Sequence, residues 1–259
     1  MRGKCALITG STSGLGAATA ARLAQEGCNI VLNGFGHGEA IEVQRSELEK
    51  AHGVRVLYHG ADLSRPQEIA DLMKGALDAF GAVDILVNNA VVRHFAPIHE
   101  FPIEAWDRSI AVNISAAFHT IRLAVPAMRA RSWGRIVNLS SIYGLIGAAD
   151  RVDYVTSKTA LIGMTRAVAL ENVAHGITCN AICPGSALTP SIDARIQALM
   201  ATESLPRDAA VQKFLAGKQP SAKFIETADV AALIAFLCGD AGRDITGAAL
   251  PIDGGWSAS

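Results

Sequence analysis

The sequence predicts an α/β protein, a doubly wound parallel sheet of about seven strands in a single domain of 259 residues. Two observations support this class. Short apolar runs, the first at residues 5–9, alternate with amphipathic stretches of helical length, and no linker or repeat interrupts them. That is the pattern of parallel strands with helices on both faces. Polar clusters follow the ends of these runs, and ligands of such sheets bind beyond the carboxyl ends of the strands.

The composition argues against several classes of protein. Half of the residues are hydrophobic and 18% are charged, which allows a large core, and the net charge of −1 comes without any basic block. We therefore expect no nucleic-acid partner and no anionic membrane partner. The longest apolar run, residues 230–238, is too short to span a bilayer, and the N-terminus lacks a signal-peptide pattern. Five cysteines without a C-x-x-C pair indicate free thiols in a reducing cytoplasm and no metal site.

The first apolar run is predicted to be a buried strand that leads through a glycine-rich loop into a helix at residues 17–25. The loop contains Gly10, Gly14 and Gly16. Strand, glycine turn and helix let backbone N–H groups and a helix N-terminus hold a pyrophosphate. Tight turns also use glycine for structural reasons alone, but this context favours a dinucleotide cofactor.

The remaining elements follow the same alternation. Pro66 suits a first helical turn, and Pro126 is expected either to kink a long helix or to begin its last segment. Residues 186–219 have mixed polarity, and an insertion of that length after a strand is typical of a substrate lid. Further strands are predicted at residues 29–32, 54–58, 84–87, 135–139, 177–181 and 250–252, and further helices at 39–51, 66–80, 106–131, 153–175 and 228–238.

One helix carries a candidate catalytic pair, Tyr154 and Lys158. Residues four apart lie one turn above each other on the same helix face. An ammonium in that position favours the phenolate and lowers the pKa of the tyrosine towards working pH, as a proton donor or acceptor requires. By itself the spacing also fits an ordinary helix surface.

Several motifs in order resemble the short-chain dehydrogenase/reductase superfamily, and the resemblance covers essentially the whole chain. It implies a Rossmann-type fold and a homotetramer with residues 255–256 near a subunit interface. Closer similarity to the bacterial D-3-hydroxybutyrate dehydrogenases lies at residues 32–36, 56–58, 60–64, 100–102, 218–221, 245–247 and 253–256. The superfamily motifs are Thr9-Gly10 through Gly14-x-Gly16, Asn88-Asn89-Ala90, Asn113, Ser141, Tyr154-x-x-x-Lys158 and Pro184-Gly185.

The resemblance implies a role for each of four residues. Tyr154 would exchange a proton with the substrate oxygen, and Lys158 would lower the tyrosine pKa and hold the nicotinamide ribose. Ser141 would orient the substrate oxygen by a hydrogen bond. Asn113 would support a water chain that returns the proton to solvent. The alternative for Ser141 and Asn113 is backbone capping, which both residue types often perform.

The expected cofactor is NAD. NADP sites need a cation near the adenosine 2′-phosphate, and neither the glycine loop nor residues 33–38 contain Arg or Lys. Asn33 stands where an NAD-selecting carboxylate is usual, and the hydroxybutyrate dehydrogenases share this segment. Asp62 and Leu63 would lie at the adenine and Thr189 at the carboxamide. The cofactor residues predicted in this way are Gly10, Thr12, Ser13, Gly14, Leu15, Gly16, Asn33, Phe35, Asp62, Leu63, Asn89, Ala90, Val112, Tyr154, Lys158, Pro184, Gly185, Leu188 and Thr189.

The chain departs from the family at two places. Val91 replaces the last residue of the pattern N-N-A-G, which puts the local backbone geometry in question. The residues that hold and wall the small carboxylate substrate also differ. The family has Gln, His, Lys, Gln and a Trp where this chain has, in turn, Arg93, Tyr143, Arg151, Arg195 and Ser186.

Arginine suits bidentate capture of carboxylate, sulfonate or phosphate, and Ser in place of Trp should enlarge the pocket. The predicted substrate-binding residues are Arg93, Ser141, Tyr143, Arg151, Tyr154 and Arg195. We expect an NAD-dependent dehydrogenase of an anionic secondary alcohol, either a 3-hydroxy acid of the 3-hydroxybutyrate type or a larger or more anionic one. The alternatives are an NADPH-dependent 3-oxoacyl-thioester reductase, a hydroxysulfonate dehydrogenase, and a non-catalytic NAD-binding sensor.

Overall fold

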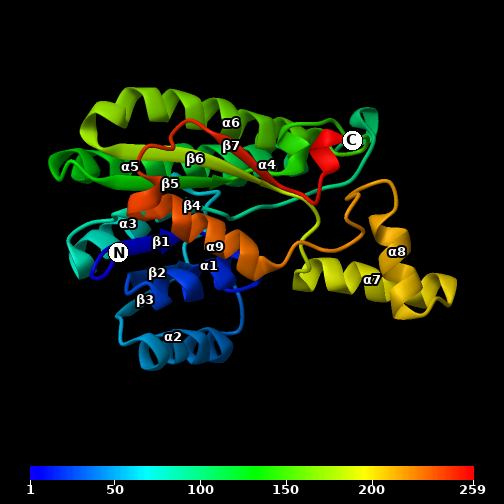
Figure 1. The fold of residues 1–259 in the computed structure, drawn as a ribbon, viewed down its shortest axis with the longest axis horizontal. Helices are drawn as coiled ribbons and strands as arrows, with labels where there is room; N and C mark the ends of the chain where they lie inside the picture. Colours follow the sequence, from blue (N-terminus) through cyan, green and yellow to red (C-terminus); the bar gives the residue numbers. More distant parts are fainter.

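All seven strands form one parallel sheet in the order β3-β2-β1-β4-β5-β6-β7 (Figure 1). The order reverses between β1 and β4, so β1 pairs with both, and Ile8 lies beside Leu32 on one side and Val87 on the other. This computed structural model describes residues 1–259 and confirms the predicted sheet. The strands are β1 Cys5–Ile8, β2 Asn29–Asn33, β3 Val56–His59, β4 Ile85–Asn88, β5 Gly134–Leu139, β6 Ile177–Pro184 and β7 Ala249–Ile252.

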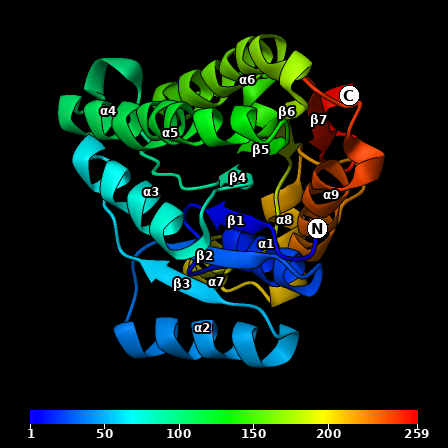
Figure 2. The same cartoon turned by 90° about the vertical axis from the view of Figure 1, so that its left-hand side faces the viewer.

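Helices cover both faces of the sheet, as Figure 2 shows. Strand side chains alternate between two buried clusters. Ile8 and Ile30 belong to the cluster on the side of α1, α2 and α9, whereas Leu7 and Val31 belong to the cluster on the side of α3, α5 and α6. The helices are α1 Gly14–Gln25, α2 Gly38–His52, α3 Pro66–Phe80, α5 Ala116–Ala130, α6 Val152–Asn172 and α9 Thr227–Cys238.

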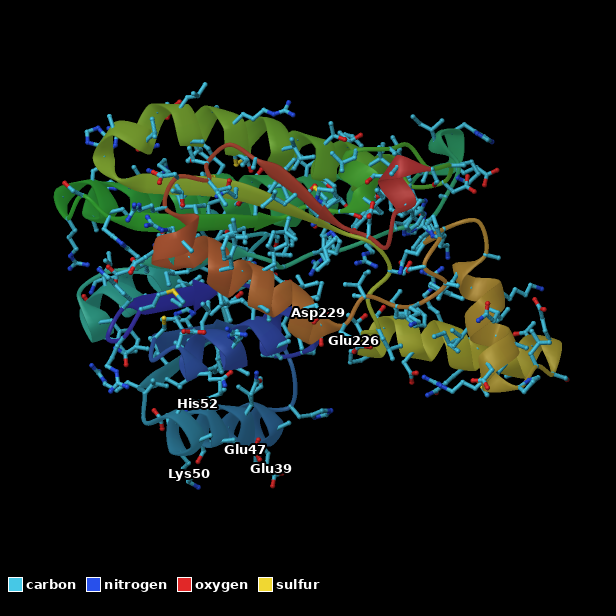
Figure 3. The ribbon with its side chains drawn as sticks, viewed as in Figure 1. Glu39, Glu47, Lys50, His52, Glu226 and Asp229 are labelled. Atoms are coloured by element: carbon cyan, nitrogen blue, oxygen red, sulfur yellow. The ribbon has the colours of Figure 1, made fainter.

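The outer surface of α2 is polar. The side chains of Glu39, Glu47 and Lys50 lie on the side of the helix away from the sheet (Figure 3). Ile41 and Leu48 are its buried residues. The amphipathic pattern in the sequence therefore places α2 correctly as a covering helix.

The predicted helix at residues 106–131 differs in detail from the prediction. It consists of α4 (Ile103–Ile110), a π-helical turn (Ala111–Ser115) and α5, which continues through Pro126. Pro126 thus begins no new segment, and the irregularity lies at the π turn, a feature that often marks a functional site. The stretch Ile103–Ala130 is long and apolar enough to cross a membrane, but residues such as Ile121 and Met128 pack into the core against the sheet.

The lid is built of two helices, α7 (Pro190–Glu203) and α8 (Arg207–Leu215), which extend beyond the carboxyl ends of the strands (Figure 1). A bridge between Ala187 and Ile225 closes its base. Its buried residues Ile192, Ile196 and Ala210 form a small apolar cluster separate from the two sheet clusters. The lid therefore has a core of its own and extends a few residues beyond the predicted 186–219.

Candidate active site

Two adjoining cavities lie at the carboxyl ends of the strands. The glycine-loop cavity, of about 580 Å³, is lined by the loop after β1 and the ends of β2, β3 and β4. The tyrosine cavity, of about 110 Å³, contains Tyr154 and Lys158 and reaches the lid. Both cavities share Leu15, Asn89, Val91, Arg93, Thr189 and Arg195. A ligand that fills the first cavity therefore ends at the mouth of the second.

The glycine loop is shaped to accept an anion. Gly10 (φ +62°) and Gly14 (φ +55°) have left-handed backbone conformations. A Cβ at Gly16 would overlap the carbonyl oxygen of Gly10. Ser13 makes no side-chain cap at the start of α1, so the first N–H groups of the helix remain available. These features fit a dinucleotide pyrophosphate.

The predicted amides of the cofactor site bind backbone. Asn89 Nδ2 donates to the carbonyl oxygens of Thr9 and Gly10, each at 2.9 Å, and so fixes the glycine loop. Asn33 Nδ2 donates to the carbonyl oxygens of His59 and Ala61, each at 3.1 Å. Both amides hold the walls of the cavity, a function that the motif alone did not show.

Two hydrogen bonds fix the backbone of the segment after β2. The Tyr58 hydroxyl donates to the carbonyl oxygen of Gly34 at 2.9 Å, and Thr12 Oγ1 donates to that of Phe35 at 2.8 Å. The cavity has one cation besides the shared Arg93 and Arg195, namely Arg108. It lies near Asp62, whose pKa is lowered chiefly by hydrogen bonds from Ser64 and in part by Arg108.

Most of the other predicted cofactor residues line one of the cavities. Leu188 lines neither and is 38% exposed, and Gly16 is buried beneath the loop. The residues in the glycine-loop cavity are Gly10, Thr12, Ser13, Gly14, Leu15, Asn33, Phe35, Asp62, Leu63, Asn89, Ala90, Val112 and Thr189. Tyr154, Lys158, Pro184 and Gly185 line the tyrosine cavity.

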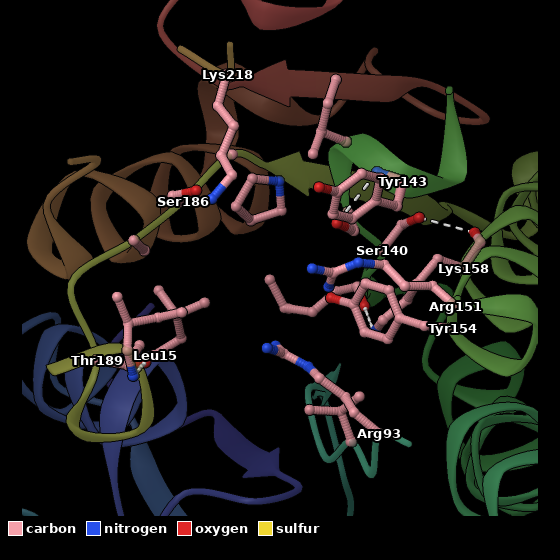
Figure 4. A pocket seen from close by; sticks show the side chains of 18 of the residues that line it. Leu15, Arg93, Ser140, Tyr143, Arg151, Tyr154, Lys158, Ser186, Thr189 and Lys218 are labelled. Atoms are coloured by element: carbon pink, nitrogen blue, oxygen red, sulfur yellow. Dashed lines mark hydrogen bonds between the residues drawn. The ribbon is translucent and has the colours of Figure 1, made fainter. Parts of the chain in front are cut away.

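Tyr154 and Lys158 lie on the buried face of α6 beneath the tyrosine cavity (Figure 4). Lys158 Nζ donates to the carbonyl oxygen of Leu139 at 2.5 Å and lies 5.5 Å from the centroid of the Tyr154 ring. Ser141 lies at the end of β5, where its Oγ accepts from the N–H of Tyr143 at 3.2 Å. Helix α6 and the end of β5 thus bring Tyr154, Lys158 and Ser141 to one wall.

The surroundings of Tyr154 favour its phenolate. Burial alone would raise the pKa of this phenol, but Arg93, Lys158, the hydrogen bond with Ser141 and Arg151 outweigh it and hold the pKa below its usual value. Arg93 is the strongest of these cations, and its Cζ lies 4.8 Å from the ring centroid. The sequence assigned this effect to Lys158 alone.

Asn113 lies on the π turn and faces the loop after β4. Its Oδ1 accepts from the N–H of Val92 at 2.9 Å, and its Nδ2 donates to the carbonyl oxygen of Val92 at 3.0 Å and to Ser157 Oγ at 3.3 Å. The two bonds to Val92 hold the loop that carries Arg93, and the third joins the π turn to α6. The role in a water chain stays a prediction.

Asp153 is a buried carboxylate that sequence reasoning missed. It accepts from Ser109 Oγ at 2.6 Å, from the N–H of His94 at 3.2 Å and from the N–H of Tyr154 at 2.6 Å. It therefore ties α4 and the Arg93 loop to the first turn of α6. Its position directly before Tyr154 was the available signal, but a helix-start aspartate is ordinarily exposed.

All three predicted arginines line the tyrosine cavity. Arg151 Cζ lies 5.0 Å from the centroid of the Tyr143 ring and 4.6 Å from that of Phe95. Arg195 Cζ, on α7, lies 5.5 Å from the Phe95 centroid. None of the three arginines forms an ion pair, and no Asp or Glu lines this cavity.

Sequence reasoning also missed Lys218 and Trp256 as cavity residues. The Trp256 ring packs edge to face against Tyr143, with centroids 5.3 Å apart. The cavity that Ser186 lines therefore still contains a tryptophan. Both residues lie in stretches that carry the family resemblance, which was the available signal. Val91 lines both cavities and has no positive φ, so its backbone does not need glycine.

The chain is similar to known dehydrogenases and reductases over its whole length. Residues 4–198 match the family described as short chain dehydrogenase. The D-beta-hydroxybutyrate dehydrogenase of Cupriavidus necator is 45% identical over 258 residues, 100% of this chain and 99% of that protein. The cis-4-hydroxycyclohexanecarboxylate dehydrogenase of Sinomonas cyclohexanicum is 36% identical over 98% of this chain and 97% of that protein. A crystal structure of L-sorbose reductase from Gluconobacter frateurii, complexed with NADPH and L-sorbose, has a TM-score of 0.96 and 30% identity, and covers 100% of this chain and 98% of that one.

Proposed function

The chain belongs to the short-chain dehydrogenase family, and we propose that it is an NAD-dependent dehydrogenase of an anionic secondary alcohol. The alcohol is a 3-hydroxy acid of the 3-hydroxybutyrate type, or a larger or more anionic one, and the product is its ketone. The observation that carries this proposal is the cavity in which Tyr154 meets three unpaired arginines and no carboxylate.

In this proposal the proton of the alcohol passes to Tyr154. Its lowered pKa makes the phenolate available as a base, and Lys158 and Arg93 stabilise that phenolate. Ser141 Oγ holds the substrate oxygen beside the tyrosine. The bound nicotinamide supplies the acceptor of the hydride that leaves the carbinol carbon. In the reverse direction the phenol returns the proton to the ketone oxygen.

The substrate carboxylate is assigned to Arg93 and Arg151. Both guanidiniums lie against aromatic rings of the cavity, Arg93 over Tyr154 and Arg151 over Tyr143. This stacking leaves the planar edges of the guanidiniums free for bidentate hydrogen bonds to a carboxylate. A sulfonate would be accepted by the same edges, so a hydroxysulfonate is the second candidate substrate.

NAD is proposed because residues 33–38 contain no cation. Tyr58 and Thr12 also hold the carbonyl groups of this segment towards the protein. L-sorbose reductase, a structural neighbour of the same fold, is complexed with NADPH. A protein of the same fold thus binds NADPH, and we assign the selection of NAD in this chain to the residues of this segment.

A spectrophotometric panel tests the proposal. The protein is assayed with NAD⁺ and with NADP⁺ on 3-hydroxy acids, hydroxysulfonates and uncharged secondary alcohols of matched length, and 3-oxoacyl thioesters are assayed with NADPH. Reduction of NAD⁺ with the anionic alcohols is the expected result. Turnover of the thioesters alone, or of uncharged alcohols as fast as anionic ones, would contradict the proposal.

We also propose a cytoplasmic homotetramer. Leu170 and Val173, at the end of α6, are 81% and 52% exposed, and Phe118 on α5 is 51% exposed. Such side chains on neighbouring helices suit a subunit interface. All five cysteines are unpaired, as a reducing compartment favours. Light scattering coupled to size exclusion measures the assembly.

A further inference from the structure

The charges of the tyrosine cavity exceed what one carboxylate neutralises. Arg93, Arg151, Lys158, Arg195 and Lys218 line this small space without one acidic side chain among its lining residues. Lys158 is committed to Tyr154 and to the carbonyl of Leu139. Four cations remain for the substrate. Like charges held together cost free energy unless a ligand compensates them.

The four cations form two groups on different elements. Arg93 and Arg151 lie at Tyr154 and Tyr143, where the reacting oxygen would bind. Arg195 and Lys218 belong to the lid, and both pack on Phe214. Arg195 also lies against Phe95, on which Arg151 packs, so the two groups adjoin. Arg195 Cζ lies 5.1 Å and Lys218 Nζ 3.8 Å from the centroid of that ring.

The lid pair is directed at the cavity. Lys218 extends towards Ser186 inside it (Figure 4). One donor of its ammonium goes to the carbonyl oxygen of Phe214, which leaves two donors free. Burial, and then Arg195 and Arg151, lower the pKa of Lys218. Of the other basic residues of the lid, Arg207 and Lys213 pair instead with Asp193 and Glu203, and the exposed Lys223 lies outside the cavity.

We propose that the substrate carries two anionic groups, with a second anion subsite formed by Arg195 and Lys218 on the lid. This inference rests on the proposed dehydrogenase function and specifies its substrate class. The simplest such substrate is a short hydroxy dicarboxylate. One carboxylate lies at Arg93 and Arg151, the hydroxyl at Tyr154 and Ser141, and the other carboxylate at the lid pair. The oxidation itself is unchanged, with one proton to Tyr154 and one hydride to the cofactor.

A second anion subsite would also explain why Arg195 and Lys218 have no acidic partner. A subsite that bound an uncharged tail would favour apolar side chains at the positions of Arg195 and Lys218. The planar guanidinium and the flexible ammonium together suit one carboxylate or one sulfonate. The second anion would thereby hold the lid over the substrate.

The test compares acids that differ in one charge. Kcat/KM is measured with NAD⁺ for 3-hydroxyglutarate, its monomethyl ester, 3-hydroxybutyrate, malate, 3-hydroxyadipate and 3-hydroxy-4-sulfobutyrate. We expect the best diacid to exceed the monoacids by at least about tenfold, because a charge-assisted contact contributes that much. The chain length of the best diacid substrate indicates the distance between the two anion subsites. The sulfo acid shows whether the second subsite prefers a sulfonate or a carboxylate.

The lid pair is tested by Arg195→Gln and Lys218→Met. Each is expected to reduce the ratio of diacid to monoacid efficiency by about tenfold or more. The matched controls on the same lid, Arg207→Gln and Lys213→Met, keep the ratio. Glutarate and butyrate binding in the presence of NADH, followed by the fluorescence of Trp256, gives a second readout that needs no turnover. Of the three tryptophans, Trp256 alone lines the cavity.

The outcomes separate the two proposals. If monoacids are oxidised, diacids are used no better and the lid variants leave the ratio unchanged, the second subsite is wrong and the dehydrogenase function stands. If no hydroxy acid is oxidised with either cofactor, the proposed function itself fails. Preference for diacids that survives both lid substitutions would place the second anion elsewhere and overturn this assignment.

Discussion

The two cavities of the site differ in how they are built. The glycine-loop cavity is shaped by backbone, with Asn33 and Asn89 bonded to carbonyl groups and Arg108 placed near Asp62. The tyrosine cavity is lined by cations that have no acidic partner. Satisfied hydrogen bonds fix a shape, whereas uncompensated charges select a ligand. Cofactor binding is therefore a property of the fold, and substrate choice is a property of a few side chains.

The largest expected effect comes from Tyr154→Phe, which should separate catalysis from cofactor binding. Loss of the proton donor is expected to lower kcat by about 10²–10⁴-fold. The dissociation constant of NADH, measured by fluorescence titration, should change by less than about threefold. Tyr143→Phe is the control in the same cavity, since its ring lies 6.2 Å from that of Tyr154. Full activity of Tyr154→Phe would show that Tyr154 takes no part in the proton transfer.

Substitution of Arg151 should act mainly on charged substrates. Arg151→Gln is expected to lower kcat/KM for 3-hydroxy acids by about 10–100-fold, the value of a charge-assisted pair. Uncharged secondary alcohols should lose much less, because their binding does not use the guanidinium and Arg151 is the smallest of the contributions that lower the pKa of Tyr154. Initial rates on both substrate types measure this. Equal losses on both would mean that Arg151 maintains the shape of the cavity instead of capturing an anion.

A cation added to the glycine-loop cavity should change the choice of cofactor. Phe35 lines this cavity and is 62% exposed. Phe35→Arg is expected to raise kcat/KM for NADP⁺ by about tenfold, because a guanidinium binds the 2′-phosphate. Val43→Arg places the same charge on an exposed residue outside both cavities and serves as the control. An equal gain from Val43→Arg would mean that any added positive charge on this side of the protein improves the use of NADP⁺, without direct contact to the 2′-phosphate.

The pH dependence offers the finest comparison between the arginines. Oxidation needs the phenolate, so its rate should rise with pH through the lowered pKa of Tyr154. Arg93 is the largest of the effects that lower this pKa, so Arg93→Gln should move the rising limb to higher pH. Arg195 is not among the groups that lower it, so Arg195→Gln is expected to leave the limb in place. A profile of kcat/KM from weakly acidic to alkaline pH measures both, and equal shifts would contradict the assignment.

The fold and the position of Tyr154 and Lys158 on one helix face were predictable because they follow local patterns. The alternation of apolar runs and amphipathic helices gave the parallel sheet, and the spacing of Tyr154 and Lys158 gave the pair on α6. The π turn was not predictable, since one extra residue in a helical turn leaves the apolar pattern of residues 106–131 nearly unchanged. It rotates Asn113 towards the loop after β4.

Roles that depend on tertiary contacts were missed. Asp153 and Tyr154 are neighbours in the sequence, yet only the packing of α4 against α6 shows that the carboxylate accepts from Ser109. Lys218 follows α8, and its position in the cavity depends on how the chain returns from the lid to the body of the protein. Asn33 lines the glycine-loop cavity as expected, but the hydrogen bonds of its amide to the backbone around the end of β3 were not predicted.

The separate core of the lid has a consequence for how such an enzyme can diverge. Ile192, Ile196 and Ala210 pack among residues of the lid and not with the sheet. The segment is joined to the body at the bridge between Ala187 and Ile225. Mutations inside it should therefore have little effect on the stability of the sheet. Apart from Thr189, Pro190 and Ser191, which line the glycine-loop cavity, the segment can be exchanged between relatives as a cassette. The substrate range of the enzyme can then evolve while its cofactor site remains constant.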